Sequence, residues 1–199
     1  MSSERHERVA SGKLIVISGP SGAGKTSICK GLLAASPAMV WSVSATTRPQ
    51  RPGDVPGESY EFLTEEEFAR REAAGEFLES AVFIGHHYGT PCGPIRRALS
   101  AGRDVIMEID VQGGVQVATR MPESVRIFVL PPDHDSLRAR LTGRRTEAQD
   151  QLDRRLAQAD GEIAFARDSG CYQYFVVNDI LETTIEAVKS ILVKEKSQA

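Results

Sequence analysis

Four short runs of apolar, often β-branched residues are spaced along the chain, and the segments between them are more polar. The runs are residues 14–17, 105–109, 125–130 and 175–177. Continuous apolar runs of this length are typical of strands that are buried on both faces of a parallel sheet. We therefore expect these four segments to form the centre of the molecule.

The segments that follow these runs carry helical signals. Residues 26–35 follow the first run, residues 95–101 end at Gly102, and residues 115–121 stop before Pro122. Near the C-terminus, apolar residues recur at spacings of three and four, at Leu181, Ile185, Val188, Ile191 and Leu192. Strands that alternate with helices predict an α/β fold with a doubly wound parallel sheet.

Two segments interrupt this alternation. Residues 42–103 begin with Thr-, Arg- and Pro-rich sequence and continue into a short helix with Thr64 and Glu67 in capping-box spacing. Aromatic and apolar residues follow in short groups, so we expect a small, partly β insertion beside the core. Residues 135–167 are rich in arginine and poor in bulky apolar side chains. They predict either a solvated charged face or a weakly packed, mobile helical lid.

The composition limits the class of protein. The chain has 199 residues and a formal net charge of −3, which suits one domain with inserted subdomains and argues against a general nucleic-acid binder. The three cysteines form no C-x-x-C pair, so a reducing cytoplasm fits better than a disulfide framework or a zinc site. Residues 1–12 are polar and predict a disordered tail, and no stretch approaches the length of a membrane span. Nothing in the sequence indicates an oligomeric state.

One motif stands directly after the first apolar run and before the first predicted helix. It fits the phosphate-binding pattern G-x-x-x-x-G-K-[ST] and consists of Gly19, Pro20, Ser21, Gly22, Ala23, Gly24, Lys25 and Thr26. In such a loop, glycines allow consecutive N–H groups to face phosphate oxygens, and the helix N-terminus adds a partial positive charge. The lysine reaches the β- and γ-phosphates and the threonine hydroxyl binds Mg²⁺. The motif therefore predicts a nucleoside triphosphate site.

The insertion supplies a second set of polar side chains. Arg48 and Arg51 lie three residues apart in a turn and could hold one phosphate group, with the hydroxyls of Tyr60 and Tyr88 added to it. Glu79 is a lone carboxylate among apolar neighbours. By itself it is more typical of a surface residue near a helix end, so these residues alone do not name the second substrate.

Seven sequence fragments occur in one order: GPSGAGKT, SATTRPQRPG, GEFLE, YGT, VIMEIDVQGG, GRRTE and VVND. In this arrangement the chain resembles the guanylate kinase family from about residue 13 to residue 194. The resemblance implies a P-loop nucleoside monophosphate kinase fold with a core (13–41, 104–134 and 168–194), a GMP-binding insertion (42–103) and a lid (135–167). It also implies the reaction ATP + GMP → ADP + GDP with Mg²⁺, in purine nucleotide metabolism, with dGMP as a further acceptor.

The resemblance assigns roles in the insertion, position by position. The residues implied for GMP are Ser44, Arg48, Arg51, Tyr60, Glu79, Tyr88, Thr90 and Asp110. The arginines and tyrosines would hold the phosphate, while Glu79, helped by Ser44 and Thr90, would recognise the base. The chemistry agrees, because guanine presents N1–H and N2–H₂ side by side and a carboxylate accepts both. Adenine has no N1–H and would leave the carboxylate unpaired.

Further residues are implied for ATP and for the metal. Arg140, Arg144 and Arg155 would reach ATP phosphates from the lid, and Asn178 would lie near the adenine. Thr26 and Asp110 would hold Mg²⁺, the aspartate through water. Asp110 follows a predicted strand at the carboxyl edge of the sheet, where open α/β sheets bind ligands. The residues implied in catalysis are Lys25, Arg48, Asp110, Arg144 and Arg155.

Two alternatives stay open at this point. The chain could be another nucleoside monophosphate kinase, for CMP, dTMP or AMP, or a non-catalytic guanylate kinase-like binding module. Such modules typically lose functional phosphate-loop residues, which this chain retains. The sequence departs from the family at Ser80, where tryptophan is common, and at His86 and His87, where Asn-Tyr is frequent. Both departures flank the predicted base pocket.

Overall fold

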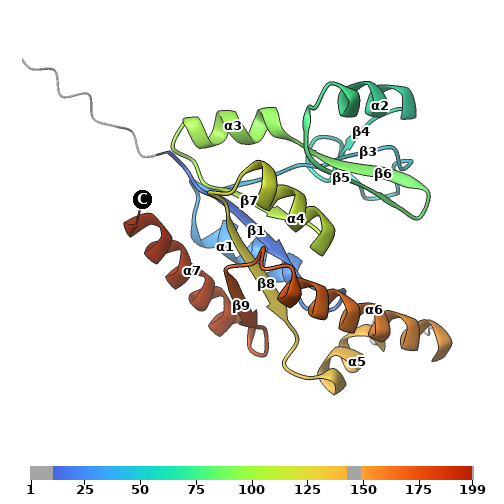
Figure 1. Cartoon of the computed structure of the whole chain (residues 1–199), viewed down its shortest axis with the longest axis vertical. Coiled ribbons are helices and arrows are strands. Elements are labelled where there is room, and N and C mark those ends of the chain that lie inside the picture. Colours follow the sequence, from blue (N-terminus) through green and yellow to red (C-terminus); the bar gives the residue numbers. More distant parts are fainter. Residues whose placement is uncertain (1–10, 143–148, 199) are drawn as a thin grey trace, which may run out of the picture.

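The computed structural model describes residues 11–142 and 149–198. Within these ranges the chain forms a five-stranded sheet in the order β2-β7-β1-β8-β9 (Figure 1). The strands are β1 (Leu14–Ser18), β2 (Val40–Trp41), β7 (Val105–Glu108), β8 (Val125–Leu130) and β9 (Tyr174–Val177). All pairings within this sheet are parallel, which confirms the predicted α/β fold.

Helices cover both faces of this sheet, because side chains that alternate along a strand point to opposite sides. The covering helices are α1 (Lys25–Ala35), α3 (Cys92–Ser100), α4 (Val111–Arg120) and α7 (Leu181–Ser197). Ile15 and Ile17 of β1 pack in one buried cluster with side chains of α1 and α7. Leu14 and Val16 pack in a second cluster with side chains of α3 and α4. The central strand is therefore buried on both faces, as its continuous apolar run predicts.

The two outer strands differ from the prediction. β2 has only two residues, too few for any periodicity, and the sequence does not predict it. β9 lies at the edge of the sheet, and Phe175 and Val177 are 41% and 51% exposed. The expectation of burial on both faces is therefore wrong for this strand. Its alternate residues, Tyr174 and Val176, pack against the cluster shared with α1 and α7, so helices cover only one face of β9.

Helix α4 begins at Val111, four residues before its predicted start. The side chain of Asp110 accepts a hydrogen bond from Gly113 N at 2.7 Å. This N-cap offsets the low helix propensity of Gly113 and Gly114. Packing also requires the second glycine, because a Cβ there would lie 2.0 Å from the hydroxyl oxygen of Tyr172.

A second sheet is built from the segment predicted as an insertion, in the order β4-β3-β6-β5. Its strands are β3 (Ala45–Thr46), β4 (Glu61–Phe62), β5 (Phe77–Phe83) and β6 (His86–Pro91). Helix α2 (Glu65–Ala73) covers it through Phe68, whose ring stacks on Phe77 with centroids 4.5 Å apart. Thr64 Oγ1 accepts a hydrogen bond from Glu67 N at 3.1 Å, as the capping-box spacing predicts. Figure 1 shows this sheet beside α3 and α4; the boundaries 42–103 stay a prediction.

The described part of the arginine-rich segment includes the helices α5 (His134–Thr142) and α6 (Gln149–Asp168). The expectation that it packs weakly for lack of apolar residues is wrong. A buried cluster joins the two helices and contains Leu137, Leu141, Leu152, Leu156 and Ala159. The leucines repeat at helical spacing within each helix, so each helix covers the apolar stripe of the other.

Some predictions concern residues outside the described ranges. The predicted disordered tail lies outside them up to residue 10, and so does Arg144 of the predicted lid. Gly12, assigned to the tail by the sequence, donates a hydrogen bond from its N–H to Leu99 O at 2.9 Å. Among the described helices, none is long and apolar enough to cross a membrane.

Candidate active site

The predicted phosphate loop connects β1 to α1 at the carboxyl edge of the central sheet. Gly22 and Gly24 have φ values of +87° and +91°, in the left-handed region that favours glycine. Asn178, which follows β9, supports the loop: its Nδ2 donates to Ala23 O at 2.7 Å. A Cβ on Gly24 would lie 2.2 Å from that nitrogen. The shape of the loop thus depends on a side chain from a distant strand.

Arginines of both lid helices reach this region. Arg140 Nη2 donates to Asn178 O at 2.9 Å, and Arg155 Nη2 donates to Ser21 Oγ at 3.0 Å. Asn178 Oδ1 is buried and is the one such side-chain atom of the described residues without a hydrogen-bond partner. The structure therefore brings two of the three predicted lid arginines to the loop and its support.

The Lys25 ammonium lies over the loop that precedes it. Its Nζ donates to Gly19 O at 2.7 Å and to Pro20 O at 3.1 Å. Burial lowers the pKa of Lys25, and the nearby Glu108 carboxylate opposes this effect. A partly desolvated cation beside a helix N-terminus is suited to binding phosphate oxygens.

Thr26, at the start of α1, is paired with a carboxylate from the neighbouring strand. Thr26 Oγ1 donates to Glu108 Oε1 at 3.1 Å, at the end of β7. The sequence analysis did not assign Glu108 to the site; its signal was its position two residues before Asp110 on the same strand face. Asp110 Oδ1 is occupied in capping α4. A hydroxyl and a carboxylate form an oxygen donor set that suits Mg²⁺.

Three side chains of the predicted base pocket are joined by hydrogen bonds. Thr90 Oγ1 donates to Glu79 Oε1 at 2.5 Å, and Ser44 Oγ lies 3.1 Å from Thr90 Oγ1. Because the threonine proton is used on Glu79, the serine is the donor in the second bond. Glu79 is 6% exposed, and burial raises its pKa to about 7; the Thr90 bond opposes the rise and the Asp110 charge adds to it. A surface role for Glu79 is therefore wrong.

Helix α4 lies beside the second carboxylate oxygen of Glu79. A Cβ on Gly113 would lie 3.1 Å from Glu79 Oε2, so the helix approaches the carboxylate closely. Any larger side chain there would press on the carboxylate that the resemblance assigns to the base. Glycine is therefore needed at this position for close approach.

The predicted phosphate-binding residues of the insertion gather around Arg48. Its guanidinium is 5.3 Å from the ring of Tyr60, and the rings of Tyr60 and Tyr88 are 5.9 Å apart. Arg48 Nη2 donates to Asp54 Oδ2 at 2.9 Å, and the backbone N–H of Arg51 donates to the same oxygen at 2.8 Å. Asp54 thus holds both predicted arginines in one turn. The sequence analysis missed it, although an aspartate after Arg-Pro-Gly is a turn signal.

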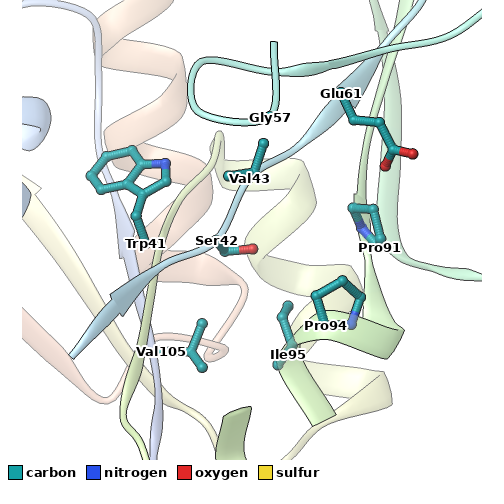
Figure 2. Close-up of a pocket in the computed structure, with 9 residues that line it drawn as sticks. All are labelled: Trp41, Ser42, Val43, Gly57, Glu61, Pro91, Pro94, Ile95 and Val105. Atoms are coloured by element: carbon teal, nitrogen blue, oxygen red, sulfur yellow. The ribbon is translucent and has the colours of Figure 1, made fainter. Parts of the chain in front are cut away.

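A cavity of about 260 Å³ lies elsewhere, where the second sheet connects to the core. Figure 2 shows Trp41, at the end of β2, with Ser42 and Val43 after it, Pro94 and Ile95 of α3 on the other side of the cavity, and Val105 of β7 below Ser42. Its lining is mostly apolar and includes none of the predicted site residues. The cavity is a feature of the connection between the two sheets and is separate from the phosphate loop.

Comparison with known proteins shows the family to which the chain belongs. The family model described as guanylate kinase matches residues 11–195. The chain belongs to the guanylate kinase family. A guanylate kinase of Symbiobacterium thermophilum is 45% identical over 94% of this chain and 87% of its own length. One of Desulfitobacterium hafniense is 45% identical over 93% of this chain and 91% of its own length.

A solved structure shows the same family fold. The crystal structure of guanylate kinase from Anaplasma phagocytophilum matches 94% of this chain and 87% of its own chain, with a TM-score of 0.74 and 32% identity. These findings support the guanylate kinase prediction and give no support to the two alternatives, another monophosphate kinase or a binding module.

Proposed function

We propose that the loop of residues 19–26 binds ATP and that the pocket around Glu79 binds GMP. The reaction is that of guanylate kinase, in which the γ-phosphoryl group of ATP passes to GMP to give ADP and GDP. One observation carries the assignment of the acceptor: a buried carboxylate aligned by the hydroxyls of Thr90 and Ser44. An ionised carboxylate only accepts hydrogen bonds, and guanine offers adjacent N1–H and N2–H₂ donors.

The acceptor phosphate is bound, in this proposal, by Arg48, Arg51, Tyr60 and Tyr88. Arg48 is 6% exposed and already positioned by Asp54, so little side-chain entropy is lost when GMP binds. A phosphate monoester has a second pKa near 6, so GMP carries an ionised oxygen at neutral pH. The acceptor therefore needs no general base, and the residues around it act by orienting that oxygen.

The donor phosphates are bound by the loop N–H groups and Lys25, with Arg140 and Arg155 added from the lid and Arg144 as a further catalytic arginine. Support comes from the contacts of Arg155 with Ser21 and of Arg140 with Asn178, which place both guanidiniums beside the loop. Fixed positive charges near the transferring group stabilise the charge that spreads over its oxygens. The buried Asn178 Oδ1 is an acceptor suited to the amino group of adenine.

Thr26 and Glu108 fit Mg²⁺, because a hydroxyl and a carboxylate oxygen lie 3.1 Å apart beside the phosphate loop. We assign Asp110 to the same ion through water, since one of its oxygens caps α4. When bound with ATP, Mg²⁺ neutralises charge on the β- and γ-phosphates.

The proposal also covers closure of the site, the acceptor dGMP and the location in the cell. The second sheet with α2 and the α5–α6 pair would close on the core and exclude water, which would otherwise accept the phosphoryl group. We further propose that dGMP is accepted. A cytoplasmic location is supported by the free state of the described cysteines.

A coupled assay of ADP release with ATP, Mg²⁺ and a panel of nucleoside monophosphates tests the proposal. GMP should give the fastest release, and Lys25→Ala should lower turnover by at least about 100-fold. Lys30→Ala is the matched control, because Lys30 is an exposed lysine of the same helix. Equal turnover in the two variants, or a preference for AMP or CMP, would reject the assignment.

A further inference from the structure

Strand β5, which carries Glu79, is an edge strand with an irregular register. Among the strands of the described residues, it pairs with β6 alone. Phe77 is opposite Pro91 and Glu79 is opposite Thr90, so β5 advances by two residues where β6 advances by one. Leu78 is therefore the extra residue of a β-bulge. Bulges re-aim side chains, and this one directs Glu79 onto the Thr90 hydroxyl.

The free edge of β5 is paired with side chains of α4 in place of another strand. Gln116 Nε2 donates to Ser80 O at 2.9 Å, and Ser80 N donates to Gln116 Oε1 at 3.2 Å. One amide thus satisfies both backbone groups of the residue that follows Glu79. Unpaired backbone groups at a partly buried edge are costly, so these bonds restrain the strand where the carboxylate leaves it.

Arg120 holds the bulge itself. Its Nη1 donates to Phe77 O at 2.7 Å and to Leu78 O at 3.0 Å. These are the carbonyls of the residue before the bulge and of the extra residue itself. Arg120 lies one helical turn after Gln116, so both side chains come from the same face of α4. The sequence analysis singled out neither residue.

We propose that Gln116 and Arg120 are positioning residues for guanine recognition. By holding both sides of Glu79 on the bulged edge, they fix the direction of its carboxylate. That direction determines whether both oxygens can accept from N1–H and N2–H₂ of one base. The proposal rests on the proposed function and adds to it a determinant of selectivity that does not touch the substrate.

Recognition of guanine by Glu79 depends strongly on the angles of its hydrogen bonds. Hydrogen bonds weaken steeply when their angle departs from linearity, and two parallel bonds to one carboxylate tolerate less rotation than a single bond. A hypoxanthine base has N1–H but no 2-amino group, so it uses one of the two bonds. A carboxylate that has lost its alignment keeps more of its interaction with hypoxanthine than with guanine. Selectivity for GMP over IMP is therefore the quantity that the two α4 residues control.

The test measures kcat and KM for GMP, IMP and ATP in the full-length chain and in matched variants. Gln116→Met keeps the side-chain length but removes the amide, and Arg120→Met removes the guanidinium. Both should raise the KM for GMP about tenfold, and lower the ratio of kcat/KM for GMP to that for IMP about tenfold, with the KM for ATP unchanged. Thr119→Ala is the control, because Thr119 is exposed on α4 and its hydroxyl donates to Val115 O of its own helix.

The outcomes separate this inference from the function it rests on. Wild-type protein without GMP-dependent ADP release would reject the function. Active wild-type protein together with folded variants that keep its selectivity would reject only the positioning role. Equal losses for GMP and IMP with a lowered Tm would also reject it, since a purely structural residue acts that way. If Gln116→Met does not fold, Arg120→Lys decides, because it keeps one donor for the bulge and should restore part of the selectivity lost in Arg120→Met.

Discussion

The buried carboxylate of Glu79 should cost the free protein stability, and its replacement by glutamine should recover it. Burial raises the pKa of this group from an ordinary 4.5 to about 7. Between these two values the folded chain binds a proton that the unfolded chain does not. The carboxylate therefore lowers the free energy of unfolding as the pH rises from about 4.5, and the loss is complete above about pH 7. Glutamine does not ionise, so the Glu79→Gln variant lacks this dependence of stability on pH.

The magnitude follows from the size of the pKa difference. At about 1.4 kcal/mol per pH unit, a rise from 4.5 to about 7 corresponds to about 3 kcal/mol above neutrality. Urea unfolding of the wild type and Glu79→Gln should therefore show a stability difference that widens by roughly 2 to 3 kcal/mol, in favour of the variant, between pH 5 and pH 8. The difference between the two proteins is used because it removes the contribution of other titrating groups.

The same variant should lose guanine recognition, with a KM for GMP raised about 100-fold or more, because an amide offers one acceptor where the base presents two donors. Glu66→Gln is the control, since Glu66 is an exposed carboxylate on α2. A stability difference that stays constant from pH 5 to pH 8 would show that Glu79 does not titrate as a buried group. The carboxylate would then be solvated in the free protein, and the reasoning from its burial would be refuted.

Three other perturbations are predicted from single contacts. Gly24→Ala should destabilise the chain by about 2 kcal/mol in urea unfolding and abolish binding of an ATP analogue, because its Cβ would lie 2.2 Å from Asn178 Nδ2 at a φ of +91°. Asp54→Ala should raise the KM for GMP about tenfold without changing that for ATP, since it releases Arg48; equal KM changes would contradict this. Chelation with EDTA should stop ADP release and added Mg²⁺ should restore it, and persistent activity would exclude the oxygen pair of Thr26 and Glu108 as a metal site.

The central sheet could be predicted because its inner strands are buried on both faces and so appear as continuous apolar runs. Of the outer strands, β2 was too short to be predicted, and β9 was predicted as a strand but with the wrong exposure, which depends on its place at the edge of the sheet. Phenylalanine is typical of core positions, yet Phe175 lies on the exposed face of β9. In the lid helices, Leu137 and Leu141 have the spacing of an apolar helix face. Such a pair predicts burial only when the helix that covers it is known, and in the structure this helix is α6.

The candidate site also contains residues that the sequence predicts and residues that it does not. The phosphate loop could be predicted from contiguous residues, because one stretch of backbone makes the binding surface. Glu79 needed the family resemblance, since nothing local shows that Thr90 will meet its carboxylate. Gln116 and Arg120 gave no signal, because they bond to main-chain atoms of a strand far away in the sequence. Side-chain patterns contain no information about which backbone carbonyls a bulge will expose.

The segment from β7 through α4 contacts both halves of the proposed site. Glu108 accepts the bond from Thr26, Gly113 lies against Glu79, and Gln116 holds the strand that carries that carboxylate. A helix resists bending because successive backbone hydrogen bonds fix its shape. One continuous piece of chain therefore links the proposed donor and acceptor sites. Since a misplacement of about 1 Å can lower a rate about 100-fold, we expect α4 to contribute to the alignment of the two proposed sites.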